Sequence, residues 1–581
     1  MNPDEPTHFN VLVVGTGLHE SITAAALSNS GYSVLQLDPA PYYGTQHASL
    51  SLSELVAWAA NHPSASSSPS SPPEHLLKQS QRFALSLAPL LLRAQGPALD
   101  LLVRSKVAAY LQFGLLNGVG LVNPQEGRVD RVPASKADVF NDQRLSLVEK
   151  RRLTKLLLFA AGQDRLEEDK VLAADPDLPF VDYLSKAFSL SGPAASSLTY
   201  ALALCSSPSD PALPALARLR SIIHSVGRYG PSPYLVGHYG GAGDLVGGFS
   251  RICAIWGGGQ ILGRPVGALE RTPEVGRSVD PGASPFAMGQ EKAPPAPAAP
   301  APSKENQEGR EEATTRPLGI PVELEPGQKT TFTGDWVLSS PYLLSTLFPS
   351  SSASDSPASS SQPTSAHLIA ILPSPVSFPP PREPRGPDEG DEPDSNLFVF
   401  LPGSLGEKEG EEGARVGTVT ALQVGKGTMS CPDGYHILYL SAPLLVPFSP
   451  SEQPDAAALL QPYLDALLAL PPASPPPPSS STDDPAPPPT AISPLYTVFY
   501  VSSAPPPPPS APNLELPANL LVLPSPPSLS RASALIDTLD ELVPLCEETF
   551  WTVVGEEGRR EGVEFFAREK REEEDDAGGE E

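Results

Sequence analysis

The chain has 581 residues, a formal net charge of −28 and 73 prolines. This acidity argues against a surface that binds nucleic acid or an anionic membrane. Most of the proline lies in runs such as 294–302 and 475–478. Such runs predict linkers, so we expect the folded part to be shorter than the whole chain.

The four cysteines lie far apart and form no CxxC pair, which disfavours both a disulfide framework and a zinc site. The N-terminus is polar and has no signal-peptide pattern, and no apolar run approaches the roughly 18 residues of a membrane span. These features predict a reduced protein of the cytoplasm.

The first fifty residues predict a strand–turn–helix–strand unit. An apolar strand over 9–14 leads into Gly15-Thr16-Gly17, a helix follows over 21–30, and a second strand over 32–37 ends at Asp38. This order and length are typical of a dinucleotide-binding βαβ unit.

The later patterns predict an α/β fold, namely a Rossmann-type (FAD/NAD(P)-binding-like) multi-sheet domain with an inserted all-helical subdomain and long disordered insertions. Residues 76–116 are apolar at helical spacing, and 336–338 predict a strand that returns to the first sheet. Further strands are predicted at 367–372, 397–401, 418–424, 435–440, 496–501 and 520–523, and a last amphipathic helix at 532–550.

Composition divides the chain into four parts. The first part of the Rossmann-like domain covers 1–133, with a surface insertion at 62–75, and the helical subdomain covers 134–226. The rest of the Rossmann-like domain covers 227–554, and 555–581 is an acidic tail that we expect to be disordered. Low-complexity insertions are predicted at 272–316, 350–364, 374–395 and 471–490.

The glycine turn raises the question of a bound cofactor. Gly15 and Gly17 allow the backbone to approach a pyrophosphate at a helix N-terminus, and Asp38 is placed to hold a ribose hydroxyl. Glu20 stands where such sites have a third glycine, and its carboxylate would repel a pyrophosphate. Two interpretations stay open from these residues: a bound FAD or NAD, or a scaffold kept for its shape.

Two blocks of sequence carry a resemblance to a known family. The first runs from Val13 to Ile22 and continues through Val34–Asp38 into Tyr42-Tyr43-Gly44; the second runs from Gly227-Arg228-Tyr229-Gly230 to Gly257-Gly258. Together they resemble the Rab GDP-dissociation inhibitor and Rab escort protein superfamily. That family has a glutamate at the position of Glu20 and binds no flavin, so the resemblance implies no cofactor.

Two further segments resemble the escort branch of that family. Residues 131–141 with 148–151 resemble the entrance to its helical domain, and 428–435 resemble its extra C-terminal strands. The length of the chain and its insertions also suit escort proteins.

The resemblance implies a platform that binds GDP-loaded Rab GTPases. On this chain the platform residues are Tyr43, Asp244, Arg251, Gln260 and Ile261. An aromatic and an aliphatic side chain suit buried contact, and a carboxylate and a guanidinium suit pairing. The chain departs from the family pattern at the last two positions, and it has aspartate at 244 where glutamate is usual.

The helical subdomain is implied to hold geranylgeranyl lipid and to dock on the Rab geranylgeranyltransferase alpha/beta heterodimer. Ile222 is the position implied for the transferase contact. The side chains that could line a lipid groove are Leu156, Leu157, Phe159, Phe180, Val181 and Leu184. The alternative for each of them is an ordinary place in the helical core.

Three functions follow from these observations. The first is a non-catalytic escort protein that presents GDP-bound Rabs to the transferase and carries the prenylated product to membranes by transient contact. The second is a Rab GDP-dissociation inhibitor that only recycles prenylated Rabs, and the third is an FAD-dependent oxidoreductase. The chain has no compact Asp/Cys/His set for a catalytic zinc, so thiol alkylation would belong to another protein.

Overall fold

The structure is a computed structural model that describes residues 6–133, 139, 145–162, 165–271, 316–349, 362–380, 394–405, 415–446, 448, 454–471, 492–505 and 516–566. The predicted insertions at 272–316 and 471–490 lie almost entirely outside these residues. So do most of 350–364, the second half of 374–395, and most of the segment 134–144 at the predicted helical-domain entrance.

The first sheet contains the N-terminal strand–turn–helix unit. Its strands are β1 (His8–Val14), β2 (Val34–Asp38), β11 (Gly259–Leu262), β12 (Glu270–Arg271), β13 (Leu318–Glu325), β14 (Gln328–Ser339) and β20 (Leu520–Val522). Their order is β11-β2-β1-β14-β13-β12, with β20 beside β14. β1 is parallel to both β2 and β14, so the predicted return of the chain to the first sheet is confirmed.

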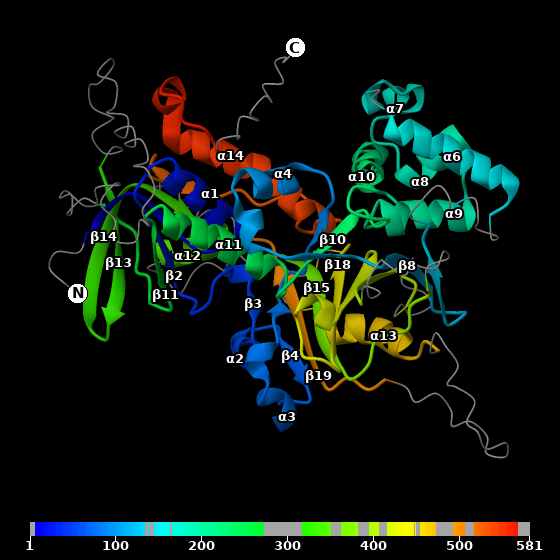
Figure 1. The fold of residues 1–581 in the computed structure, drawn as a ribbon, viewed down its shortest axis with the longest axis horizontal. Helices are drawn as coiled ribbons and strands as arrows, with labels where there is room; N and C mark the ends of the chain where they lie inside the picture. The colour runs from blue at the N-terminus through cyan, green and yellow to red at the C-terminus, as the bar shows by residue number, and fades with distance from the viewer. Residues whose placement is uncertain are drawn as a thin grey trace, which may run out of the picture.

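Three long helices, α1 (Leu18–Asn29), α11 (Ala242–Ile255) and α14 (Ala534–Arg560), form a layer packed on this sheet. The shorter helices of this region are α4 (Pro97–Arg104) and α12 (Leu344–Leu347). α1 packs against both α11 and α14, which makes α1 the buried centre of the layer (Figure 1). Eleven of its twelve residues are buried, which its small alanines and serines permit.

A second, larger sheet follows. Its strands are β4 (Ser66–Ser68), β8 (Gly118–Asn123), β9 (Arg128–Arg131), β15 (Pro363–Leu372), β16 (Asn396–Phe400), β17 (Val419–Val424), β18 (His436–Pro443) and β19 (Tyr496–Ser503). They run in the order β4-β19-β15-β18-β17-β16-β8-β9. α13 (Ala456–Leu468), which the sequence reading did not predict, covers one face through Leu460, Tyr463 and Leu467.

Short elements connect the two sheets. They are α2 (Leu52–Asn61), α3 (Glu74–Leu77), β3 (Ser49–Leu50) with β5 (Leu85–Ser86), and β6 (Leu91–Arg93), β7 (Phe113–Leu115) and β10 (Tyr234–Gly237). Only 97–104 of the predicted helical stretch 76–116 is a long helix. The prediction was wrong for 85–93, where the leucines are buried on both faces of extended segments that pair with β3 and β10.

The helical subdomain stands apart at the upper right of Figure 1. Its helices are α6 (Leu147–Ala161), α7 (Lys170–Ala174), α8 (Phe180–Phe188), α9 (Gly192–Ser196) and α10 (Ala212–Ser225). α6 begins with a capping box in which the Ser146 hydroxyl and the Glu149 carboxylate satisfy each other's backbone amides. The predicted α/β class, with several sheets and an inserted helical block, is confirmed.

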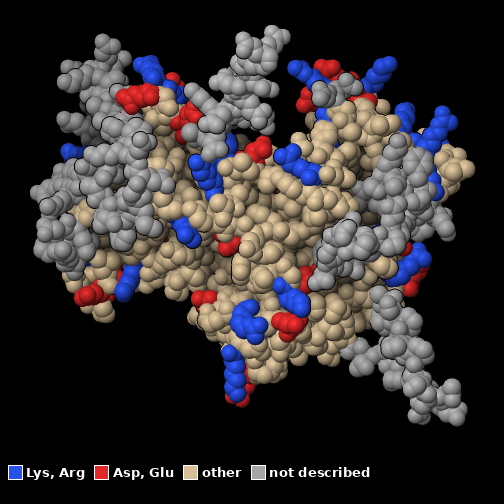
Figure 2. Space-filling view, in the orientation of Figure 1, with Lys and Arg blue, Asp and Glu red and all other residues tan. Residues whose placement is uncertain are grey.

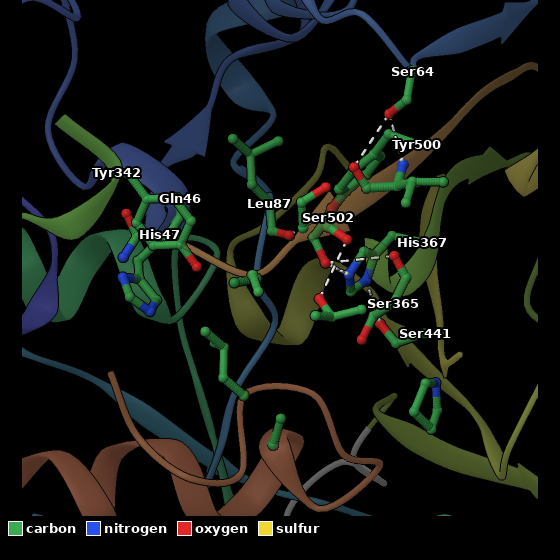
Figure 3. Close-up of a pocket in the computed structure, with 18 of the residues that line it drawn as sticks. Gln46, His47, Ser64, Leu87, Tyr342, Ser365, His367, Ser441, Tyr500 and Ser502 are labelled. Atoms are coloured by element: carbon green, nitrogen blue, oxygen red, sulfur yellow. Dashed lines mark hydrogen bonds between the residues drawn. The ribbon is translucent and has the colours of Figure 1, made fainter. Parts of the chain in front are cut away.

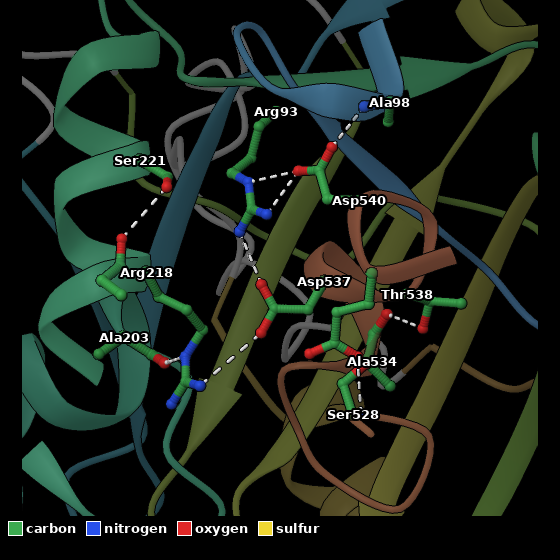
Figure 4. Close-up of polar contacts among 12 residues, drawn as sticks. Arg93, Ala98, Ala203, Arg218, Ser221, Ser528, Ala534, Asp537, Thr538 and Asp540 are labelled. Atoms are coloured by element: carbon green, nitrogen blue, oxygen red, sulfur yellow. Dashed lines mark hydrogen bonds and ion pairs between the residues drawn. The ribbon is translucent and has the colours of Figure 1, made fainter. Parts of the chain in front are cut away.

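A buried ion cluster joins this helical block to the rest of the molecule (Figure 4). Arg93 on β6 contacts Asp537 through Nη1 at 2.6 Å and Asp540 through Nε at 2.8 Å, both on α14. Arg218 on α10 lies 3.7 Å from the other oxygen of Asp537 and donates from Nε to the Ala203 carbonyl at 2.6 Å. α14, β6 and α10 are therefore held at one point by charges that are nearly excluded from water.

One predicted insertion and the start of the predicted acidic tail are built into the fold. The surface insertion at 62–75 contains β4, which adds a strand to the edge of β19, because serine hydroxyls and the extended backbone suit an exposed edge. The prediction of a disordered acidic tail over 555–581 is wrong for its first residues. Phe565 and Phe566 are each only 3% exposed and pack with Phe550 and Phe249.

Candidate functional site

The glycine turn between β1 and α1 is filled by a side chain of its own helix. Gly15 has φ +110°, a conformation that an L side chain rarely adopts. A Cβ atom placed on Gly17 would lie 2.5 Å from Oε2 of Glu20, so this carboxylate occupies the space over the turn. Glu20 is 2% exposed, and its Oε2 has no hydrogen-bond partner in the described part of the chain.

Burial sets the charge state of this carboxylate. Removal from water, with a smaller effect of Asp38, raises the pKa of Glu20 to about 7. Burial therefore favours the neutral, protonated form of this side chain far above the pH at which an exposed glutamate ionises. A bound pyrophosphate would raise the cost of its ionisation further.

Both carboxylate oxygens of Asp38, at the end of β2, accept hydrogen bonds from nearby residues. Its Oδ2 accepts hydrogen bonds from the Thr16 hydroxyl at 2.6 Å and the Thr45 hydroxyl at 3.0 Å, and its Oδ1 accepts from the Ala40 amide at 2.9 Å. The Thr16 hydroxyl in turn accepts from the Gly44 amide at 3.0 Å. The carboxylate therefore fixes the turn that follows β2.

These contacts do not fit a dinucleotide. The space for a pyrophosphate holds Glu20, the amide of Leu18 at the start of α1 donates to Nδ1 of His47, and the carboxylate expected to hold a ribose fixes a turn. The four residues predicted for a former cofactor motif, Gly15, Gly17, Glu20 and Asp38, are thus brought together in a closed arrangement.

The turn fixed by Asp38 presents Tyr43 at the surface. Tyr43 is 38% exposed, and burial of the rest of its ring, with the nearby Cys253 thiol, raises its pKa. Gly44, with φ +107°, follows it and leads into the short 3₁₀ helix η1 (Thr45–His47), which packs against α11. The sequence motif therefore places an aromatic ring beside α11.

α11 carries two of the predicted platform residues on one face. Asp244 and Arg251 are seven residues apart, close to two helical turns, so they project on the same side. Asp244 is half-buried, and burial raises its pKa to about 6. Arg251 is exposed, and its guanidinium lies 4.4 Å from the ring centre of Tyr110.

Tyr110 is a surface residue that sequence reasoning missed. It ends the 3₁₀ helix η3 (Val107–Tyr110), is 42% exposed, and is more than a hundred residues from Arg251 in the chain. No local pattern marks it, because its place beside Arg251 depends on the packing of η3 against α11. We define the platform surface as Tyr43, Tyr110, Asp244 and Arg251.

The two other predicted platform residues are more deeply placed. Gln260 on β11 donates to the Ser250 carbonyl at 3.2 Å, so it ties the strand to α11. Ile261 is half-buried and packs against the apolar cluster under the first sheet. Both side chains are half-buried, and the hydrogen bond of Gln260 links β11 to α11.

The residues predicted for a lipid groove lie in the helical core. Leu156, Phe180 and Leu184 are fully buried, and Phe159 is half-buried with its ring centre 5.7 Å from that of Phe188. In this structure they form packed core rather than the wall of an open groove, because α6, α8 and α10 close on one another. A lipid between these helices requires them to separate.

Ile222, predicted to contact the transferase, is 3% exposed. It belongs to the buried stripe of α10 with Ala215, Leu216 and Leu219, so its side chain does not reach a partner here, and a direct contact through it is not supported. The exposed apolar side chains of the helical block are on α6 instead: Leu147, Val148 and Leu158. Figure 2 shows Lys and Arg side chains standing out from this block at the upper right.

A cavity of about 760 Å³ opens between the two sheets. Tyr42, Gln46 and His47 line it from the turn after β2, and His367, Tyr500 and Ser502 line it from the second sheet (Figure 3). None of the predicted site residues lines it.

Among the described residues, no helix has both the length and the apolar character to cross a membrane. Nor do three or more His, Cys, Asp or Glu side chains gather there as a candidate metal site.

Comparison with known proteins identifies relatives of the N-terminal half. Residues 4–277 match the family model described as GDP dissociation inhibitor. Over 287 residues the chain is 34% identical to the Rab proteins geranylgeranyltransferase component A of Drosophila melanogaster, which covers 46% of this chain and 55% of that protein. It is 31% identical over 323 residues to Rab escort protein 1 of Arabidopsis thaliana, covering 47% of this chain and 57% of that protein.

A third relative, Rab GDP dissociation inhibitor beta of Canis lupus familiaris, is 30% identical over 261 residues, or 44% of this chain and 56% of that protein. The chain thus spans about half the length of the curated relatives it matches. Among solved structures, a Rab GDI from Plasmodium falciparum superposes with a TM-score of 0.57 at 18% identity, over 93% of this chain and 98% of that one. This last likeness concerns the fold alone. The family model and the named relatives confirm the resemblance drawn from the sequence motifs.

Proposed function

We propose that the chain is a Rab escort protein, because residues 4–277 match the family model described as GDP dissociation inhibitor. It binds GDP-loaded Rab GTPases on the platform surface, presents them to the Rab geranylgeranyltransferase heterodimer, and delivers the prenylated product to membranes. In this proposal the chain is an accessory protein and the transferase supplies the catalysis. Its site of action is the cytosol, with transient membrane contact.

The observation that carries the proposal is the platform surface itself. Tyr43 and Tyr110 offer exposed aromatic area, and Arg251 and Asp244 offer a cation and an anion on one helix face. Aromatic residues and arginine are the side chains most often responsible for binding energy at protein interfaces. The names of the relatives favour a Rab as the partner.

Two tests separate this surface from the rest of the molecule. Tyr43→Ala and Arg251→Ala should each weaken binding of a GDP-loaded Rab, measured by calorimetry, by about tenfold or more, the effect of losing roughly 1.4 kcal/mol. Arg82→Ala removes an exposed arginine on the short helix that follows α3 and serves as the matched control. Wild-type affinity in both platform variants would refute the assignment of the surface.

A Rab GDP-dissociation inhibitor is the second candidate, since the family model and one of the relatives carry that name. Reconstituted prenylation distinguishes the two. An unmodified Rab and the purified transferase should yield prenylated Rab only when this chain is added. If the Rab stays unmodified, while the chain still extracts prenylated Rab from membranes, the recycling role replaces the escort role.

We also propose that the chain works without a flavin. The support is Glu20 in the space over the glycine turn, together with the local use of Asp38. The purified protein should show no flavin absorption in the visible range. A flavin band near one equivalent would refute this proposal and reopen the oxidoreductase alternative.

A further inference from the structure

The cavity between the two sheets has the size of a small-molecule site. Its volume of about 760 Å³ falls within the roughly 300–1,000 Å³ of ligand pockets in proteins. The platform residues Tyr43, Tyr110, Asp244 and Arg251 do not line it, although Tyr42 and Thr45 from the same turn as Tyr43 do.

One wall of the cavity is aromatic. Trp58 on α2 lies with its ring centre 5.0 Å from that of Tyr500 on β19, and the His62 ring lies 4.6 Å from Trp58. The His367 ring stacks on Tyr500 at 5.0 Å and is held at both nitrogens by the hydroxyls of Ser441 and Ser502. These contacts fix the rings in place. Trp58 and Tyr500 meet edge to face at 83°, so they form a corner that a ligand ring can contact with its face against one ring and its edge against the other.

The opposite end offers an unused hydrogen-bond donor. Nδ1 of His47 accepts the Leu18 amide, so the ring hydrogen is on Nε2. His47 is 5% exposed, lines the cavity, and has no partner for Nε2 among the described residues. The buried Oε1 of the neighbouring Gln46 also has no partner in that part of the chain. Burial lowers the pKa of His47 to about 4, so the ring is a neutral donor.

The charge of the lining differs from that of the whole molecule. The chain has a net charge of −28, yet no Asp or Glu is among the described residues that line the cavity. Its single charged lining residue is Arg531, which is exposed and has no ion-pair partner within the described ranges. A cation without a nearby carboxylate favours an anionic group on the ligand.

We propose that this cavity binds a small planar aromatic molecule that carries one anionic group. The ring lies in the corner between Tyr500 and Trp58, an acceptor on the ligand receives the Nε2 hydrogen of His47, and the anionic group lies beside Arg531. This site is independent of the Rab platform, and no GTPase is needed to test it.

A matched pair of dyes tests the proposal on the full chain. The probes are 8-anilino-1-naphthalenesulfonate, which is anionic, and N-phenyl-1-naphthylamine, which lacks the sulfonate. Both should bind one saturable site, with energy transfer from tryptophan to the dye. Trp58→Phe should reduce the transfer but keep the affinity measured by calorimetry, because Trp58 is the tryptophan in the lining and phenylalanine keeps an aromatic ring there.

Arg531→Gln tests the charge. It should weaken binding of the anionic dye by about three- to fivefold, as expected for one exposed ion pair, and leave the neutral dye unchanged. If Arg531→Gln binds the anionic dye as tightly as wild type does, the proposed role of Arg531 is refuted, and with it the anionic ligand class.

Two more variants test the place of binding. Ala88→Phe puts a ring into the half-buried lining and should reduce the affinity of both dyes at least tenfold, while Leu158→Ser on the exposed face of α6 should change neither. Circular dichroism checks that each variant is folded, and Ser64→Phe on another wall replaces Ala88→Phe if that variant does not fold. Dye affinity that is lost in Leu158→Ser, or kept in a folded cavity-filling variant, would overturn the proposal.

Discussion

At the scale of the residue, Glu20 decides what the glycine turn is able to hold. Its carboxylate occupies the space that two glycines leave open, and it has no ion-pair partner among the described residues. Ionisation of a buried acid is unfavourable, so Glu20 lowers the free energy of unfolding at any pH where it must ionise.

Glu20→Gln should stabilise the protein at pH 8. The folded-state pKa of about 7 lies above the ordinary value of 4.5, so stability is highest below pH 4.5 and falls as pH rises through 7. The amide cannot ionise, and we expect a gain on the order of 3 kcal/mol at pH 8 with little change at pH 4.5. Urea unfolding at both pH values measures it.

The control for this prediction is Glu74→Gln, a change of the same chemistry at an exposed position on α3. It should leave the difference in stability between the two pH values as it is in wild type. A Glu20→Gln protein with the wild-type pH dependence would contradict the assigned charge state.

Asp244 gives the platform surface a pH dependence of its own. Burial raises its pKa to about 6, so the free protein loses this negative charge as pH falls below 6. If the partner contributes a cation there, affinity should be constant above pH 7 and drop several-fold between pH 7 and 5. Calorimetric titrations across that range measure the drop.

Asp244→Asn should bind more weakly at pH 7.5, and its affinity should change much less between pH 7 and 5. Arg82→Ala, with an intact Asp244, should retain the wild-type profile. An Asp244→Asn protein with wild-type affinity at pH 7.5 would exclude a charged contact at this position.

At the scale of the element, α14 is extended by a short anchor. Gly555, with φ +71°, bends the chain, and Phe565 and Phe566 then return to the core beside Phe550 and Phe249. Arg104 on α4 lies over the Phe565 ring, 5.8 Å from its centre. The sequence reading missed this anchor because acidic residues surround the two phenylalanines on both sides.

Removal of this anchor should weaken the whole domain. A chain that ends at residue 562 loses both buried rings, and we expect its stability to unfolding to fall by about 3 kcal/mol or more. A chain that ends at residue 566 keeps the rings and should unfold like wild type. Equal midpoints for the two truncations in urea would show that the rings contribute no stability.

Element prediction succeeded where a pattern was local. Apolar runs separated by two glycine breaks predicted the positions of β1, the glycine turn, α1 and β2. Runs of β-branched residues predicted the strands of the second sheet. It failed at 85–93 and at α13. Leucines buried on both faces of a short strand have the spacing of a helix, and α13 lies in a stretch dominated by proline and alanine.

At the scale of the whole molecule, the position of the helical block depends on the cluster of Arg93, Arg218, Asp537 and Asp540. The four residues come from three distant parts of the chain and are all less than a tenth exposed. Removal of one member leaves the others charged and unpaired in a dry environment, which is far more costly than loss of a surface pair.

Arg93→Met should therefore destabilise the protein by about 3 kcal/mol or more, because it leaves two carboxylates without their main partner. The exposed pair Arg128–Glu126 provides the control, and Arg128→Met should cost less than about 1 kcal/mol. Thermal unfolding of both variants distinguishes them. Equal midpoints would show that the buried cluster contributes no more than a surface pair.

The candidate site could be predicted only in part. The motifs predict Tyr43, Asp244 and Arg251, because each lies within a short conspicuous stretch. In the structure Asp244 and Arg251 are on α11, and η1, which follows Tyr43, packs against that helix. Tyr110, the cavity between the sheets and the buried state of Ile222 depend on contacts between residues far apart in the chain. No pattern of neighbouring residues in the sequence predicts such contacts.

The parallel pairing of β1 with β14, and the packing of α1 against α14, set an order for biosynthesis. The first fifty residues leave the ribosome long before the strand and the helix that complete their core. β1 has a free edge until β14 has been made, and α1 has an uncovered apolar face until α14 has been made. Nascent chains should therefore depend on chaperones until the helix α14 has been made.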